Sequence, residues 1–256
     1  MNSSKSGAQN TEPPGTAAGY NPAWLGWAAM LVPVLAANLA YLISANDGLV
    51  PWCFAYLEGC TSISRAARVG DATPVFRALM LPYTGLLAAV WWLNAHWLRG
   101  LIPERRKRRT TMLTLGVLAA VFLALYVSYL GVEGDTARWL RRYGINVYFG
   151  FSVLAQMLLT SLLHGVSAVP LLTRRAMTAL CCALLGLGLA SLPLQALVVD
   201  RDALLNAIEW SYALLMSLFF PFVVYAWNAT GFRIGVQVWN SSAARHSKPH
   251  TPETPP

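Results

Sequence analysis

Apolar residues in this chain occur in six long runs, separated by segments that hold most of the charge. The runs lie at about 23–44, 78–98, 111–131, 144–166, 176–198 and 205–227. A nearly uncharged run of about 18 residues or more is typical of a transmembrane helix, because at about 1.5 Å per residue it crosses a hydrocarbon core of roughly 30 Å. The pattern therefore predicts an all-α polytopic membrane protein, built as a bundle of six transmembrane helices.

The composition agrees with a chain that is solvated by lipid. Hydrophobic residues make up 56% of the sequence and charged residues 12%, whereas soluble domains carry about 25% charge. The net charge of +8 does not indicate a nucleic-acid partner, because much of the basic charge is confined to one short segment that cannot build a folded basic face. That segment contains Arg99, Arg105, Arg106, Lys107, Arg108 and Arg109.

The distribution of charge between alternate loops predicts the orientation in the membrane. Residues 99–109 and 174–175 are basic, and short basic loops face the cytoplasm in most membrane proteins. Residues 45–77, 132–143 and 199–204 hold most of the acids and are expected on the opposite side. Both termini are then cytoplasmic. Three arginines run against the rule from the outer side, but the inner clusters are denser: Arg138, Arg141 and Arg142.

Three parts of the chain follow from these patterns. Residues 1–20 are polar and rich in Gly and Pro, without the apolar core of a cleavable signal peptide, and are expected to be a disordered cytoplasmic tail. Residues 21–230 form the six-helix membrane domain. Residues 231–256 have a similarly polar composition and are expected to be a mostly disordered cytoplasmic tail.

One polar segment between the first two runs stands out, WCFAYLEGCTSISRAARVGD at residues 52–71. It contains Cys53 and Cys60, and its predicted side of the membrane is an oxidising compartment in which disulfides persist. We expect the two cysteines to close a small disulfide loop, and two buried free thiols are the alternative. The segment is then a short ordered cap that leads into the second transmembrane helix.

Glu209 is the most unusual ionisable residue, because it lies inside the last apolar run, near its outer end. A carboxylate at the middle of a bilayer costs about 2.5–3.5 kcal/mol on insertion scales, and less near the surface. We expect it to face the bundle interior and to pair with Arg65 or Arg68 of the polar segment. The alternative is a side chain that extends to the interface.

The sequence gives little support to catalysis or metal binding. Ser62 and Ser64 are hydroxyls on the predicted outer side, but no histidine lies on that side to activate them. His96 and His164, near the opposite ends of their helices, are fewer than the three or four ligands that a metal site needs. We therefore assign no catalytic residue, no metal ligand and no cofactor, and a non-enzymatic role is favoured.

Two motifs resemble a known family. The stretch TSISRAARVGDATPVFRALMLPYTG contains Ile63-Ser64 just before a membrane helix, and NAIEWSYALLMSLFFPFV contains Glu209-Trp210 at the start of the last one. Both resemble motifs of the FRAG/DRAM/SFK family of six-helix membrane proteins, and the likeness spans residues 20–230. The chain departs from the family in having Arg65 directly after Ser64, and Arg141-Arg142-Tyr143 where many members have a histidine.

The resemblance implies biology that involves lipids. Eukaryotic members take part in remodelling GPI-anchor lipids, in autophagy at lysosomes and in holding a phosphoinositide-kinase complex at the plasma membrane. We accordingly expect a lipid-associated binding or scaffold protein, with membrane lipids as partners and a protein partner at the cytoplasmic loop or tails. The residues expected to bind the lipid or substrate are Ser62, Ser64, Arg65, Arg68, Glu209 and Trp210.

Two other functions remain open from the sequence. One is an enzyme that remodels lipids at the outer leaflet by means of Glu209 and the polar segment, and the other is a transporter of small solutes. In each case the protein is integral to a membrane. That membrane is expected to be the plasma (inner) membrane in a bacterium, and an endomembrane or the plasma membrane in a eukaryote.

Overall fold

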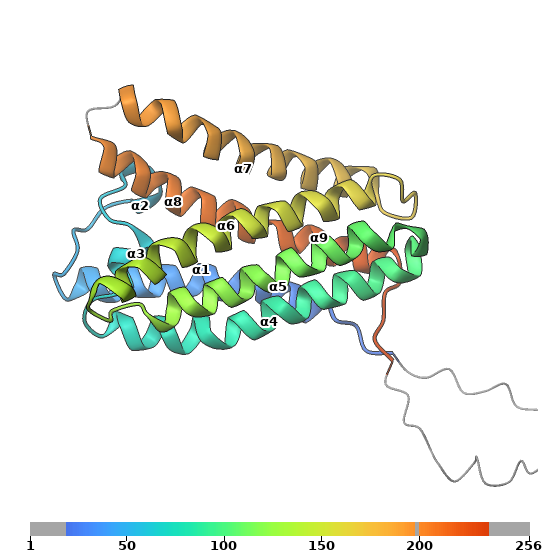
Figure 1. The fold of residues 1–256 in the computed structure, drawn as a ribbon, viewed down its shortest axis with the longest axis horizontal. Coiled ribbons are helices and arrows are strands. Elements are labelled where there is room, and N and C mark those ends of the chain that lie inside the picture. Colours follow the sequence, from blue (N-terminus) through green and yellow to red (C-terminus); the bar gives the residue numbers. More distant parts are fainter. Residues whose placement is uncertain (1–18, 198–199, 236–256) are drawn as a thin grey trace, which may run out of the picture. The chain divides into compact units, whose positions relative to one another are not determined.

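The structure is a computed structural model that describes residues 19–197 and 200–235. The regular structure of Ala23–Phe232 is helical (Figure 1). Six helical segments are long and apolar enough to cross a membrane, which confirms the prediction from the apolar runs. The helices are α1 (Ala23–Asn46), α2 (Ala55–Glu58), α3 (Ile63–Ala66), α4 (Ala72–Leu101), α5 (Arg106–Ser128), α6 (Asp135–Leu163), α7 (Leu171–Leu197), α8 (Arg201–Ser217) and α9 (Phe219–Ala229), with a 3-10 turn η1 (Pro103–Arg105) before α5.

Several helices are longer than the apolar runs that predicted them. α4 begins at Ala72 instead of residue 78, and α6 begins at Asp135 instead of residue 144. An apolar run marks only the part of a helix that lies in hydrocarbon, whereas helical hydrogen bonding continues into polar turns at the interface. The first turns of α4 and α6 carry arginines, which is why the apolar pattern excluded them.

The last membrane segment is broken into two helices. α8 ends at Ser217 and α9 begins at Phe219, with Leu218 between them. Pro221 explains the break, because it has no N–H to donate to the carbonyl of Ser217 and its ring crowds that carbonyl.

Successive long helices run antiparallel, so the connections gather at two ends of the bundle (Figure 1). Residues 47–71, here called the capping loop, contain α2 and α3 and connect α1 to α4. The α5–α6 connection at residues 129–134 and the start of α8 lie at the same end, which we call the disulfide end. The α4–α5 and α6–α7 connections lie at the opposite end.

Aromatic side chains fill the centre of the bundle. Trp91 of α4 and Phe219 and Trp227 of α9 are fully buried. Gly116 of α5 lets that helix approach Trp91 closely, because a Cβ at this glycine would lie 2.2 Å from Trp91 Cγ. α7 packs against α6, α8 and α9, at one side of the bundle.

A second small unit is formed by residues on the two sides of the helical region. Tyr20 and Ile234 exchange two backbone hydrogen bonds of 2.9 Å as an isolated antiparallel bridge. The tails predicted at residues 1–20 and 231–256 otherwise lie largely outside the described residues.

Candidate functional site

The capping loop is attached to α8 through its backbone. Asn206 Nδ2 donates to the carbonyl oxygen of Gly59 at 2.8 Å, and Trp210 Nε1 donates to that of Thr61 at 2.9 Å. Gly59 adopts a φ of +60°, and a Cβ there would lie 1.8 Å from the carbonyl oxygen of Ala203. Only glycine permits both this backbone conformation and this approach to α8.

Glu209 takes part in the same attachment. Its Oε1 accepts a hydrogen bond of 3.3 Å from the backbone N–H of Ser64, in the first turn of α3. Ser62 caps the same helix, since its Oγ accepts from the backbone N–H of Arg65 at 3.0 Å. The free N–H groups at a helix start favour an anionic acceptor, so α8 supplies the carboxylate that α3 can use.

The predicted ion pair of Glu209 with Arg65 or Arg68 is therefore wrong. Among the described residues, Glu209 forms no ion pair within 4.0 Å. The capping loop presents its backbone to α8, while Arg65 and Arg68 are exposed. A backbone N–H takes the position at the carboxylate that we had given to an arginine.

On its other side the capping loop is tied to α1. Cys53 and Cys60 are joined in a disulfide, with their Cα atoms 6.4 Å apart. The hydroxyl of Tyr41 accepts from the N–H of Cys53 at 2.7 Å and donates to its carbonyl at 2.8 Å, and Ser44 Oγ donates to the carbonyl of Ala66 at 2.7 Å. Both ends of the loop are thus fixed to α1, and its middle is fixed to α8.

Trp210 joins these attachments into one cluster. Its indole is 1% exposed, and its ring centroid lies 5.9 Å from that of Tyr41 and 5.1 Å from that of Tyr56. Tyr56 in turn accepts a hydrogen bond of 2.9 Å from Asn38 of α1. Trp210 therefore serves to hold the capping loop, and its N–H is already engaged.

A lateral groove opens beside this cluster, between α6, α7 and α8. Its volume is about 460 Å³, within the usual range of ligand sites. Ser64 and Glu209 line it, and Asn146 and Gly150 of α6 lie exposed along it. The remaining lining residues are Ile145, Phe149, Gly188, Ser191, Leu205, Ile208 and Tyr212.

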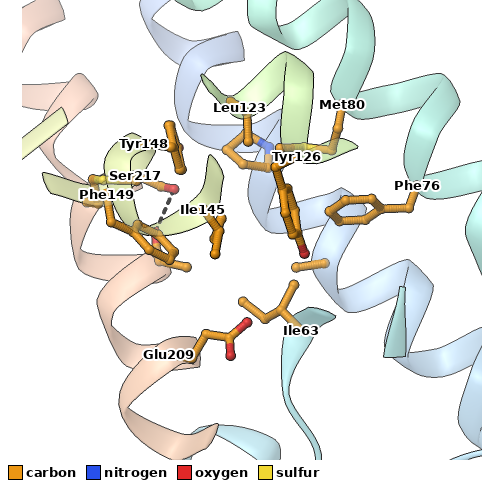
Figure 2. Close-up of a pocket in the computed structure, with 14 residues that line it drawn as sticks. Ile63, Phe76, Met80, Leu123, Tyr126, Ile145, Tyr148, Phe149, Glu209 and Ser217 are labelled. Carbon is orange, nitrogen blue, oxygen red and sulfur yellow. Dashed lines mark hydrogen bonds between the residues drawn. The ribbon is translucent and has the colours of Figure 1, made fainter. Parts of the chain in front are cut away.

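Behind the groove lies a smaller cavity inside the bundle (Figure 2). Its volume is about 50 Å³, and it is lined mainly by apolar side chains, including Phe76, Met80 and Leu123. Figure 2 shows Glu209 at one end of this cavity, next to Ile63. The side chains of Ile145, Phe149 and Glu209 line both spaces, so they form a shared wall between the cavity and the groove.

Of the residues predicted for the site, the structure brings some together and separates others. Ser64 and Glu209 meet at the groove, whereas Ser62 and Trp210 are used in holding the loop. Arg65 is exposed on the loop. Arg68 lines a separate pocket at the disulfide end, together with Arg138 and Arg141.

Sequence reasoning missed the contributions of α6 and α7. Gly150 and Gly188 leave room in the groove wall, and no atom lies within 4 Å of where a Cβ of Gly150 would be. Small residues in a membrane helix also allow close helix packing, so a packing face and a groove have the same sequence pattern. Only the lack of a neighbouring atom at Gly150 in the structure distinguishes the groove from a packing face.

Two arginines at the disulfide end have a structural role. Arg77 of α4 donates to the carbonyls of Val127, Ser128 and Leu130, and Arg141 of α6 donates to those of Tyr129 and Val132. These are carbonyls at and beyond the end of α5, where the regular helical hydrogen bonds stop and where positive charge is favourable.

The fold and this site define a polytopic α-helical membrane protein with a groove in the side of its bundle. No protein-family model matches the chain, and no curated protein and no solved structure has significant similarity to it. In the described part of the chain, no group of three or more His, Cys, Asp or Glu side chains is placed to hold a metal ion.

Proposed function

We propose that this protein is a lipid-associated binding or scaffold protein of the FRAG/DRAM/SFK type, and that it binds a membrane lipid in the groove between α6, α7 and α8. The observation that carries the proposal is the groove itself, because it combines apolar walls with polar groups such as Ser64, Asn146 and Glu209. That combination suits an amphiphile, with its chains along the apolar walls and its polar part near Ser64 and Glu209.

The contact between the two family-like motifs supports the family part of the proposal. Ile63-Ser64 and Glu209-Trp210 are far apart in the sequence, yet Ser64 donates to Glu209 and Trp210 donates to Thr61 beside the first motif. Because the two motifs meet at one site, an architecture shared with the family explains their presence better than it would if they lay apart.

The proposed orientation places the disulfide end outside and both termini in the cytoplasm. It is supported by Arg99–Arg109 and by Arg174 and Arg175, all at the opposite end of the bundle. The arginines that appeared to oppose this orientation include Arg141, which is engaged with the carbonyls after α5. The membrane is proposed to be a plasma (inner) membrane in a bacterium, and an endomembrane or plasma membrane in a eukaryote.

Lipid binding in the groove can be tested by filling it. Gly150→Leu adds a side chain whose Cβ has no atom within 4 Å, so the substitution fills groove volume. Gly186→Leu is the matched control, because Gly186 is an exposed helical glycine with equally free space that does not line the groove. Leucine has a higher helix propensity than the glycine it replaces at both positions, so both variants should fold.

The measurement is mass spectrometry of lipids that remain bound after purification in a mild detergent. We expect one lipid class to be enriched over the bulk membrane in the wild type and in Gly186→Leu, and reduced about tenfold or more in Gly150→Leu, a change of about 1.4 kcal/mol. Equal lipid content in all three proteins, or no enrichment in the wild type, would exclude the groove as a lipid site.

A further inference from the structure

A basic pocket lies at the disulfide end, next to the groove. It has a volume of about 460 Å³ and is lined by Arg68, Arg138 and Arg141, with Glu133 as the one acid in its lining. The three arginines come from two separate parts of the chain, the turn after α3 and the first turns of α6. Three guanidinium groups against one carboxylate leave the pocket with a net positive charge.

The pocket and the groove are neighbours on the same two elements. On α6, Arg141 of the pocket is followed one turn later, on the same helix face, by Ile145 of the groove. In the capping loop, Ser64 of the groove precedes Arg68 of the pocket by four residues.

The arginines are well placed to take an anion. Arg141 is held in position by the carbonyls of Tyr129 and Val132, so its guanidinium loses little freedom when it binds a ligand. Arg138 contacts Asp135 at 3.5 Å, but both side chains are highly exposed, and such pairs contribute little stability and exchange easily. A phosphate group offers several oxygens to such planar donors.

Exposed aromatic side chains place the pocket at the depth of lipid headgroups. Trp139 and Tyr143 lie on the first turns of α6, 58% and 49% exposed, with ring centroids 4.6 Å apart. Exposed Trp and Tyr near the end of a membrane helix are typical of the membrane–water interface. An arginine pocket at this depth can reach the phosphate of a lipid headgroup, which arginine binds through its planar donors.

We propose that Arg68, Arg138 and Arg141 form a binding site for a phosphate ester, and that this phosphate belongs to the lipid whose chains occupy the groove. The part of this inference that names a lipid as the source of the phosphate rests on the proposed function. The phosphate chemistry itself rests on the arginine pocket. A soluble organic phosphate carries the same group, so the experiment separates these two sources.

The test is a titration of the full chain in detergent with three probes, followed by native mass spectrometry. The probes are dioctanoyl phosphatidic acid, dioctanoylglycerol, which has the same chains without phosphate, and glycerol 3-phosphate, which has phosphate without chains. The variants are Arg68→Gln and Arg138→Gln, singly and together. Arg142→Gln is the matched control, because Arg142 is an exposed arginine of the same helix turn that does not line the pocket.

We expect the wild type to bind phosphatidic acid about tenfold or more tightly than dioctanoylglycerol, because charge-assisted hydrogen bonds to phosphate are strong. The double variant should lose that difference, and Arg142→Gln should keep it. Comparable affinity for glycerol 3-phosphate, with the same arginine dependence, would retain the phosphate site and assign it to a soluble ligand. Equal binding of phosphatidic acid by the wild type and the double variant would overturn the proposal.

Failure of the proposed function would give a different result. If Gly150→Leu binds phosphatidic acid and dioctanoylglycerol as the wild type does, the groove does not hold the chains. The arginine dependence of phosphate binding is judged separately, from Arg68→Gln and Arg138→Gln. Each proposal thus has its own variant and its own outcome.

Discussion

Replacing Trp210 with phenylalanine tests how the capping loop is held to α8. Trp210→Phe keeps an aromatic ring in the cluster with Tyr41 and Tyr56 but removes the indole N–H that donates to the carbonyl of Thr61 at 2.9 Å. Trp210 is 1% exposed and Thr61 is fully buried, so water cannot replace the missing donor without opening the loop.

The expected cost has two parts. A buried carbonyl left without its donor costs about 1–3 kcal/mol. The space vacated by the smaller ring adds about 1 kcal/mol, by comparison with other large-to-small substitutions in well-packed cores. We therefore expect the free energy of unfolding to fall by about 2–4 kcal/mol.

The assay is equilibrium unfolding in detergent micelles, combined with hydrogen exchange of the loop. Trp92→Phe is the control, because Trp92 is 55% exposed on α4 and its loss should change stability by no more than about 0.5 kcal/mol. Exchange should accelerate in residues 56–66 of Trp210→Phe and stay unchanged in the control. If Trp210→Phe lowers the free energy of unfolding no more than Trp92→Phe does, and hydrogen exchange in the loop is unchanged, the idea that this hydrogen bond holds the loop is refuted.

Two further predictions concern the loop and the topology. Gly59→Ala should destabilise the protein by more than about 2 kcal/mol, because its Cβ would meet the carbonyl of Ala203. Gly48 has a similar positive φ but free space around it, so Gly48→Ala should cost only about 1 kcal/mol of backbone strain. Equal unfolding free energies for the two variants would contradict the close approach of Gly59 to Ala203. Alkaline phosphatase fused after residue 60 should be active and after residue 104 inactive, and the reverse pattern would overturn the proposed orientation.

The membrane architecture was predictable because it depends on a strong and simple signal. Runs of apolar residues such as 23–44 and 111–131 are required by the thickness of the hydrocarbon core, and each corresponds to a helix in the structure. Helix ends were less predictable, since the arginines in the first turns of α4 and α6 break the apolar pattern without ending the helix.

The site was predicted only in part, because its contacts depend on backbone groups. Glu209 was singled out by its cost in a membrane, and its position beside the capping loop was anticipated. Its partner was not, because every residue except proline carries a backbone N–H and the sequence does not show which one is free at a helix start. The groove was missed for a similar reason, since Gly150 has the same sequence appearance whether a helix or empty space lies opposite it.

The attachment of the capping loop has a consequence for how its surface can change. Apart from the ring contact of Trp210 with Tyr56, side chains of α8 bind the loop through the carbonyls of Gly59 and Thr61 and the N–H of Ser64, so these hydrogen bonds depend on the path of the backbone. Exposed positions such as Leu57 and Arg65 are then tolerant of substitution. A short epitope or a fluorophore attachment site placed at Leu57 should leave the loop seated, which would give a tag at a known point on the bundle's surface.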